Sequence, residues 1–519
     1  MMAPYEPLAP LDAFFLYLES PATPMHLGSV AIFEGGPLRD RHGVLRIGAI
    51  RDEIASRLHL VPALRRRVRF PAGGGTAPVW VDDAGFDIGF HVRHVAVPAP
   101  GSDADLTDLC AELMAVPLDR ARPLWEMWFV EGLAGGRVAL VEKLHHAMAD
   151  GMASVELATV LLDLERRPAE HHPARPWHPR PGPTGAAAVA RDLAHRGTAA
   201  VRAGTRALGA IVDPAAAGRG GTELLEGLGT LASPRTIAPT SSINVPVTRG
   251  RRFAVVRRDL GSLRIVEERF GVTLNDVVLA AVTGGLRVLL AGRGESTGGR
   301  SLRALVPVGA DHHGDRRLGN RVSALLVPLP LGAEDPVARL RSVADAVGVR
   351  KARHQALVGE ALLGLLDPMP TRLLATLTPL VHHQRLCNLV VTNVPGPQFP
   401  LYAMGARMLE VFPVVPLAGN LSVGVAVFTY DGQLTVGILA DRERCRDVAV
   451  LAAGVDRSFA ELVSAATGGH SRRPAPESLG VSPARPRGGS ATRHVEQAKR
   501  SAAANDGARR AAPPGGSVL

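Results

Sequence analysis

Hydrophobic and polar positions along the first third of the chain predict mixed α/β structure. Residues 27–33 and 138–144 are short apolar runs rich in β-branched side chains, as expected of strands. Apolar residues at helical spacing between Ile47 and Leu64 predict a helix. A second helix is expected at 152–164, where two apolar stripes leave only a narrow polar edge, so this helix should be largely buried.

A similar mixture returns between about residues 251 and 469. The expected strands are Phe253–Val256, Ser301–Val308, Val322–Pro328, Leu389–Thr392, Ser422–Tyr430 and Gln433–Leu439. The last two of these form a hairpin, because Asp431 and Gly432 supply the positive φ angles that a tight turn requires.

Composition divides the chain into four parts. Its 519 residues are too many for one ordinary core, and proline, alanine, glycine and arginine dominate from Arg166 to about Gly250. Beyond Gly469 large apolar residues almost vanish, which is typical of disorder. The expected parts are a first domain at 1–170, a crossover linker at 171–250, a second domain at 251–469 and a disordered basic tail at 470–519.

Charge and cysteine content narrow the classes of function. Residues 471–519 carry nine Lys or Arg and three Asp or Glu, so this tail holds six of the ten formal positive charges. The remaining body is too near neutral to bind nucleic acid on charge grounds. The 3 cysteines are far apart, with no CxxC pair, which favours a reducing cytoplasm. Neither a secretory signal nor a membrane span is expected, since Arg287 and two glycines interrupt the longest apolar run, Val277–Gly292.

One histidine pair stands out among the four in the chain. His145 and His146 lie between an expected strand and an expected helix, and are followed by Asp150 and Gly151. A histidine near its ordinary pKa accepts a proton from a hydroxyl without a metal. Adjacent side chains at a strand end point to opposite faces, so only one of the two histidines can face a given cleft.

The neighbours of this pair suggest supporting roles. Asp150 can fix the loop as a helix N-cap or through an arginine partner, and Gly151 permits a tight turn into the helix. A metal site is the competing interpretation, although adjacent histidines do not easily converge on one ion. A purely structural cluster is the other alternative.

The sequence around these residues resembles a known family. HHxxxDG is the signature of the coenzyme A-dependent acyltransferase superfamily, which includes chloramphenicol acetyltransferase and the condensation domains. Further motifs resemble the bacterial wax ester synthase/diacylglycerol acyltransferase family, over roughly residues 8–465. These motifs are Pro10-Leu11-Asp12-Ala13-Phe14-Phe15 with Pro24-Met25-His26, the PLW motif at Pro123-Leu124-Trp125 inside the run from Pro117 to Glu126, the ND motif at Asn275-Asp276, Leu318-Gly319-Asn320, Thr392-Asn393 with Pro395-Gly396-Pro397, and Gly419-Asn420.

This resemblance implies two chloramphenicol-acetyltransferase-like α/β domains with a tunnel between them, joined by the long crossover. His146 would be the general base, His145 would support the loop and Asp150 would orient it. Four further residues are implied as motif or substrate-tunnel candidates: Gly151, Asn275, Asp276 and Asn393. The alternative interpretation of the ND motif is helix capping, and Pro123, Leu124 and Trp125 are expected to be structural.

The implied reaction is the transfer of a long-chain acyl group from acyl-CoA to the hydroxyl of diacylglycerol, and possible wax ester synthesis from fatty alcohols. It would use no metal, no cofactor and no covalent acyl-enzyme, since acyl-CoA is a substrate. Two alternatives stay open. One is an acyltransferase acting on another lipid or polyketide hydroxyl; the other is an inactive lipid-binding paralogue, against which the intact His146 and Asp150 argue.

Lipid substrates predict a cytoplasmic protein at the inner face of the plasma membrane or at lipid inclusions. Two segments are candidates for this peripheral contact: the basic amphipathic stretch Val189–Ile211 and the arginine-rich tail. The alternatives are a crossover helix packed on the body and a dispensable, solvated tail.

Overall fold

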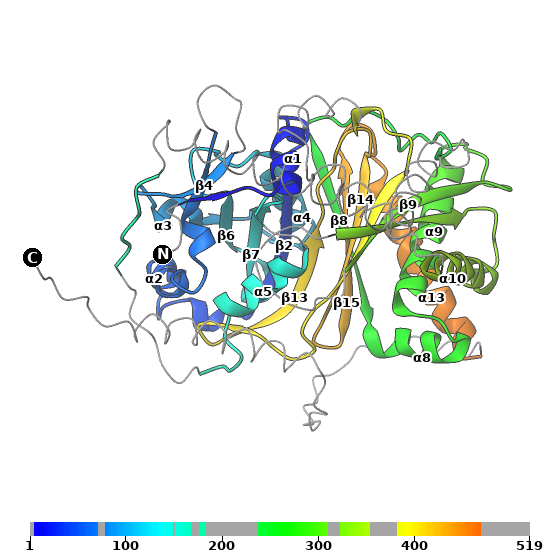
Figure 1. Ribbon diagram of the computed structural model, residues 1–519. Coiled ribbons are helices and arrows are strands. Elements are labelled where there is room, and N and C mark those ends of the chain that lie inside the picture. Colours follow the sequence, from blue (N-terminus) through cyan, green and yellow to red (C-terminus); the bar gives the residue numbers. More distant parts are fainter. Residues whose placement is uncertain are drawn as a thin grey trace, which may run out of the picture.

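The residues that the computed structural model describes form two six-stranded sheets and a three-stranded one (Figure 1). These residues are 5–70, 78–148, 151–167, 176–182, 237–309, 322–352 and 381–468. The two larger sheets lie side by side, and each has helices packed on it. This is the two-domain α/β architecture that the sequence predicted, while the tunnel between the domains stays a prediction.

The first large sheet has the strand order β12-β13-β2-β7-β6-β5. Its strands are β2 (His26–Phe33), β5 (Val92–Ala96), β6 (Trp125–Glu131), β7 (Val138–His145), β12 (Tyr402–Ala403) and β13 (Ala406–Val414). Alternate residues of β2 face opposite sides: Ala31 and Phe33 join one apolar cluster, Val30 and Ile32 another. The first cluster includes residues of α1 (Pro10–Leu18), α2 (Ile47–Arg57) and α5 (Gly151–Leu161), and the second includes α4 (Asp103–Ala115).

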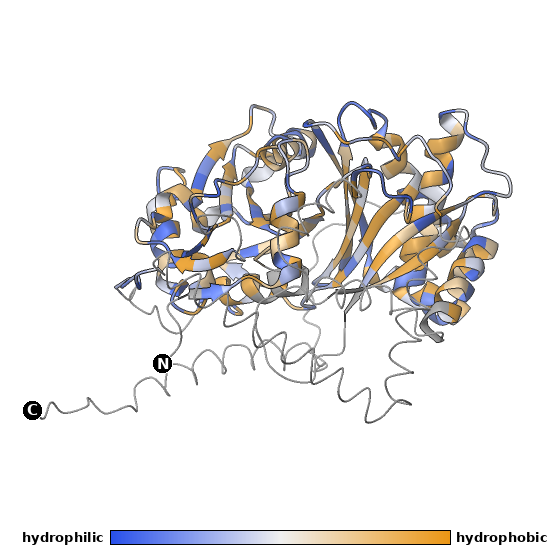
Figure 2. Ribbon diagram, turned by 45° about the horizontal axis from the view of Figure 1, so that its top comes forward, coloured by the Kyte–Doolittle hydropathy of each residue, from blue (hydrophilic) through white to orange (hydrophobic). Residues whose placement is uncertain are grey.

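The second large sheet has the order β10-β9-β11-β14-β15-β8. Its strands are β8 (Arg251–Asp259), β9 (Ser301–Gly309), β10 (Val322–Pro330), β11 (Leu389–Pro395), β14 (Val423–Tyr430) and β15 (Gln433–Asp441). It is accompanied by α8 (Leu260–Phe270), α9 (Leu274–Gly292), α10 (Pro336–Ala352) and α13 (Val448–Ala466). Figure 2 shows that the strands of this sheet are mostly hydrophobic, whereas its helices carry both kinds of residue. Together they enclose the largest apolar core.

Smaller elements complete the first domain. The third sheet has the order β1-β4-β3, with β1 at Tyr5–Pro7, β3 at Arg66–Arg69 and β4 at Val79–Asp82. A short helix, α3 (Ile88–His91), precedes β5, and three 3-10 turns lie at Gly36–Leu38, Pro62–Arg65 and Ala134–Gly136. Ser102 caps α4 through a reciprocal pair of hydrogen bonds with Asp105, which fixes where that helix begins.

The two domains interlock, because a strand from the second half of the chain joins the first sheet. The sequence division assigned residues 402–414 to the second domain, but β13 pairs antiparallel with β2 of the first sheet. The backbone of β13 also crosses β15 of the second sheet, where a Cβ on Gly437 would lie 1.9 Å from the Pro413 carbonyl oxygen. A glycine is therefore required at this crossing, because any side chain would push the two sheets apart.

Helix α4 fills the space between the domains. Its residues Leu106, Cys110 and Met114 share one apolar cluster with Phe253 of β8. Arg257 of β8 binds Asp103 at the start of this helix at 2.6 Å, and Glu410 of β13 at 2.9 Å. The second domain is thus held to the first by packing and by charge.

The eight strands predicted from the sequence are all present, and the hairpin is confirmed. Asp431 and Gly432 have φ angles of 44° and 82°, as its turn requires. One helix was predicted too long: α2 ends at Arg57, not Leu64. Proline at position 62 lacks the N–H that a continuing helix needs, and a 3-10 turn begins there instead.

Helix α9 is long and apolar enough to cross a membrane, and within the described ranges it alone meets that test. However, 72% of its apolar window is buried in the second domain, as in the core helix of a globular protein. The three cysteines are unpaired and buried. The stretch Val189–Ile211 and the tail beyond residue 468 lie outside the described residues.

Candidate active site

The histidine pair lies where β7 ends. His145 is the last residue of β7 and pairs across the sheet with His26 of β2. The side chain of His145 is fully buried, whereas His146 is partly exposed. The backbone N–H of His146 donates to the Met25 carbonyl at 2.8 Å, which ties the second histidine to the end of the loop before β2.

His145 organises the turn that follows it. Its Nδ1 accepts a hydrogen bond from the Ala147 N–H at 3.0 Å, and its carbonyl accepts one from the Met148 N–H at 2.8 Å. Because Nδ1 is an acceptor, the proton of the neutral ring resides on Nε2. That Nε2 faces the carboxylate of Glu19 at 3.5 Å.

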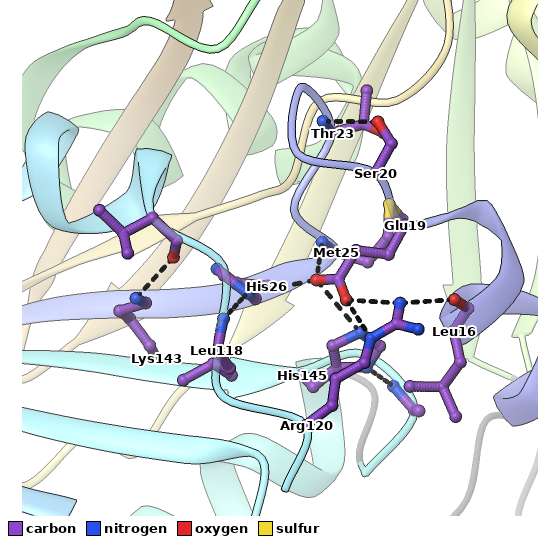
Figure 3. Close-up of polar contacts among 12 residues, drawn as sticks. Leu16, Glu19, Ser20, Thr23, Met25, His26, Leu118, Arg120, Lys143 and His145 are labelled. Carbon is purple, nitrogen blue, oxygen red and sulfur yellow. Dashed lines mark hydrogen bonds and ion pairs between the residues drawn. The ribbon is translucent and has the colours of Figure 1, made fainter. Parts of the chain in front are cut away.

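Glu19 is the centre of a buried polar cluster (Figure 3). Its Oε2 accepts from Nε and Nη2 of Arg120 at 2.9 and 2.7 Å, and its Oε1 accepts from the Met25 N–H at 3.3 Å. Oε1 also lies 3.5 Å from Nε2 of His26 and of His145. Burial alone would raise the pKa of Glu19, but its close contacts with His145, His26 and Arg120 outweigh this effect and hold the pKa well below its usual range.

His26 is the neutral member of this cluster. Its burial lowers the pKa to about 4, against the opposing effect of Glu19. Its Nε2 accepts a hydrogen bond from the Leu118 N–H at 3.2 Å, which a protonated ring could not do. The cluster therefore contains one carboxylate, one guanidinium and a neutral His26.

His146 is held by a ring contact as well as by its backbone. The Phe15 ring stacks on its imidazole with 3.9 Å between centroids and an interplanar angle of 16°. Phe15 comes from α1, the helix that ends just before Glu19. Helix α1 therefore supplies the ring that contacts His146, and the residue directly after it supplies the carboxylate that faces His145.

The PLW motif supports the end of β7 that carries the histidine pair. The Leu124 carbonyl accepts the His145 N–H at 3.0 Å. Buried Trp125 donates from its indole N–H to the Leu64 carbonyl at 2.7 Å, and its ring stacks on His91 at 4.4 Å. The Pro123 carbonyl accepts the Trp125 N–H at 2.9 Å. These contacts support the strand end instead of offering groups for chemistry.

The other candidate residues lie on other elements or outside the described residues. Asp150 falls outside them, and Gly151 is the first residue of α5. Asn275 and Asp276 open α9 of the second domain, and Asn393 lies partly exposed on β11 beside Val427 of β14. Asp276 accepts from the Thr273 N–H at 2.9 Å and hydroxyl at 2.7 Å, so it caps the helix. Its other carboxylate oxygen is buried without a partner among the described residues.

The sequence reasoning missed Glu19, Arg120 and Phe15 as parts of the site. Arg120 and Phe15 lie inside motifs that had been singled out, but spacing alone does not show that they approach the histidines. A charged residue directly after the apolar helix 10–18 was the one available signal for Glu19. Among the described residues, no group of three His, Cys, Asp or Glu side chains has the arrangement of a metal site.

Comparison with known proteins decides the family. Residues 8–278 match the wax ester synthase/diacylglycerol acyltransferase catalytic domain, and residues 318–463 match the C-terminal domain of the same family. The chain belongs to the wax ester synthase/diacylglycerol acyltransferase family. The sequence-based recognition of this family, and of an acyltransferase, is confirmed.

Relatives and solved structures agree with this membership. A probable diacylglycerol O-acyltransferase of Mycobacterium tuberculosis is 36% identical over 462 residues, covering 88% of this chain and 96% of the relative. The wax ester synthase/diacylglycerol acyltransferase of Marinobacter aquaeolei VT8 is 26% identical, with a TM-score of 0.65 over 89% of this chain and 100% of that one. The first condensation domain of the calcium-dependent antibiotic synthetase, 16% identical with a TM-score of 0.57 over 89% of this chain and 97% of that one, shares the fold.

Proposed function

We propose that this acyltransferase moves a long-chain acyl group from acyl-CoA to the free hydroxyl of diacylglycerol, making triacylglycerol, and that it also esterifies fatty alcohols. Family membership supports the reaction class. The observation that carries the assignment of the base is the contrast within the histidine pair, in which His145 is buried and committed to the turn while His146 is partly exposed.

In this mechanism His146 is the general base. Its imidazole takes the proton of the acceptor hydroxyl as the oxygen attacks the thioester carbonyl, and a tetrahedral intermediate forms. The C–S bond then breaks, the new ester is released, and the imidazolium returns its proton to the CoA thiolate. No covalent acyl-enzyme is needed, since the acceptor attacks the thioester directly.

The polar cluster around Glu19 serves this base indirectly. His145 and Met25 both contact Glu19, and both hold the segment that carries His146. A base is effective only while it stays within hydrogen-bond reach of the proton that it removes. The buried cluster keeps that segment in place, which is a positioning role.

Acyl transfer by this route requires neither a metal nor a cofactor. The thiol is a good leaving group and the base is a neutral imidazole, so no Lewis acid is invoked. Turnover should therefore be unchanged by a chelator. Inhibition by EDTA that added zinc reverses would contradict this part of the proposal.

We further propose that the protein works at a cytoplasmic membrane or lipid-inclusion surface, because its substrates partition there. Flotation with liposomes containing anionic lipid, at low and high salt, tests this association. Deletion of residues 471–519 and charge reversal of Arg191, Arg196, Arg202 and Arg206 separate the two candidate segments. Binding that survives both changes would have to come from the body of the protein.

An acceptor panel tests the function itself. Purified protein is given palmitoyl-CoA with diacylglycerol, hexadecanol or a glycolipid, and release of free CoA is followed. Acceptor-dependent release with diacylglycerol supports the proposal. Release only with another hydroxyl would identify a related acyltransferase, and no release with any acceptor would favour a lipid-binding paralogue.

A further inference from the structure

Arg251, the first residue of β8, reaches from the second domain to the loop that precedes β2. Its side chain is only 5% exposed. Its Nη2 donates to the Ala22 carbonyl of the first domain at 2.6 Å, while Nη1 donates to the Thr248 and Gly250 carbonyls of its own domain at 2.6 and 3.1 Å. One guanidinium thus joins backbone carbonyls of both domains.

A buried arginine in this position remains charged. Burial lowers its pKa to about 10, with Asp441 acting in the opposite direction, so the side chain carries its proton at neutral pH. Asp441 lies opposite Arg251 in the pairing of β15 with β8. Hydrogen bonds from a charged donor to buried carbonyls are among the stronger ones in proteins, so the link to Ala22 should be a firm one.

The loop that receives this contact is closed by its own hydrogen bonds. Ser20 and Thr23 exchange two backbone hydrogen bonds of 3.3 and 3.0 Å, and their hydroxyls lie 2.8 Å apart (Figure 3). Ala22 lies within this turn, and Met25 follows it. Because the turn is closed on itself, a displacement at Ala22 moves Met25 as well.

Met25 is the residue that leads to the base. Its carbonyl accepts the His146 N–H at 2.8 Å, and its own N–H donates to Glu19. Glu19 therefore holds the Ser20–Met25 loop from the first domain, and Arg251 holds it from the second. Loss of either contact frees one side of the support for His146.

We infer that Arg251 is a positioning residue, which sets the place of His146 relative to the second domain through the Ser20–Met25 loop. This inference rests on the proposed role of His146 as the base. It assigns to the second domain a direct part in aligning a base that the first domain carries.

The test compares Arg251→Ala and Arg251→Lys with Arg252→Ala and Arg252→Lys, since Arg252 is the exposed neighbour on the same strand. Two quantities are measured on the full chain: kcat and KM with palmitoyl-CoA and diacylglycerol, and amide hydrogen exchange in peptides covering residues 19–26 and 145–148. For Arg251→Ala we expect kcat to fall about tenfold, KM to stay within about twofold, and exchange to accelerate in both peptides. Lysine reaches fewer carbonyls and should give a smaller loss, and the Arg252 variants should match the original protein.

Two results would overturn the inference. One is that both peptides of Arg251→Ala exchange their amide hydrogens at the same rate as in the original protein. The other is that exchange becomes faster while kcat stays unchanged. If Arg251→Ala does not fold, the same comparison between the two lysine variants decides. Failure of the proposed function looks different. In that case His146→Ala would stay active, while the exchange in Arg251→Ala would still show whether the loop is held from the second domain.

Discussion

The Nε2 atom of His145 lies 3.5 Å from Oε1 of Glu19, and both side chains are almost completely buried, with exposed fractions of 0% and 4%. A buried carboxylate is stable only when charged or hydrogen-bonding groups surround it. Here the same carboxylate also binds Arg120 and the backbone of Met25. The first histidine of the pair is therefore an internal support, and the second is left for chemistry.

Replacing Glu19 by glutamine should weaken this support while keeping its shape. The variant loses the charged partner of Arg120, whose own side chain is 39% exposed, so part of the cost is screened by water. We expect the free energy of unfolding to fall by about 1–3 kcal/mol and kcat to fall about tenfold. Urea unfolding and steady-state kinetics measure the two effects.

Asp119→Asn is the matched control for this change. Asp119 forms an exposed ion pair with Arg122 on the same segment, so its loss should alter stability by less than about 1 kcal/mol. If Glu19→Gln behaves like this control in both measurements, Glu19 does not support the site.

The stability of the protein should depend on pH through His26. Its pKa in the folded state is lowered to about 4, whereas an unfolded histidine titrates near ~6.5. Between these values the unfolded chain binds the extra proton, so the free energy of unfolding falls as the pH drops from about 6.5 to 4, by up to ~1.4 kcal/mol per pH unit. Below about pH 4.5 the unfolded chain also takes up a proton at Glu19, whereas the folded protein keeps this carboxyl charged because its pKa is depressed, so stability falls further.

His26→Gln isolates this contribution. Glutamine is neutral and its carbonyl can still accept the Leu118 N–H, so the slope between pH 6.5 and 4 should become shallower. Some slope remains, since burial also lowers the pKa of His91. His42→Gln, at an exposed position, should leave the slope unchanged. Urea unfolding midpoints measured across this pH range test the prediction. If His26→Gln keeps the same slope as the His42→Gln control, His26 does not cause the pH dependence.

Gly437 tests the interlock of the two domains. An alanine there would place its Cβ 1.9 Å from the Pro413 carbonyl oxygen, so β13 and β15 would have to separate. We expect Gly437→Ala to destabilise the protein by roughly 1–3 kcal/mol, as overpacking does, and to lower activity. Gly48→Ala in α2 is the control: a Cβ there meets nothing within 4 Å, and an alanine should stabilise the helix by about 0.5–1 kcal/mol. Thermal unfolding that ranks the two variants in the opposite order would contradict the interlock.

The apolar pattern of neighbouring residues was enough to predict the strands and the turn that follows His145, because these features depend on residues close together in the sequence. Short apolar runs mark β2 and β7, and the turn after His145 is formed by the residues that follow it directly. Motifs along the chain were also sufficient to recognise the family. The assignments of His146, Asp150, Asn275 and Asn393 came from those motifs and stay predictions.

Long-range relationships could not be read in the same way. β13 looks like any strand of the second region, and its place beside β2 depends on how the two domains pack. Glu19 and Arg251 appear as ordinary charged residues in the sequence. Their importance comes from burial and from partners far along the chain, which no spacing reveals.

The central claim is that His146, and not His145, removes the proton from the acceptor. The most direct measurement is kcat of His146→Ala, with palmitoyl-CoA and diacylglycerol, beside that of His145→Ala, with circular dichroism and thermal unfolding on both. A general base contributes about 100- to 10,000-fold, so His146→Ala should lose that much turnover with an unchanged unfolding temperature. His145→Ala should lose activity together with stability, since the turn and Glu19 lose a partner. Near-original turnover in His146→Ala, with transfer dependent on His145 in a stably folded protein, would contradict the account.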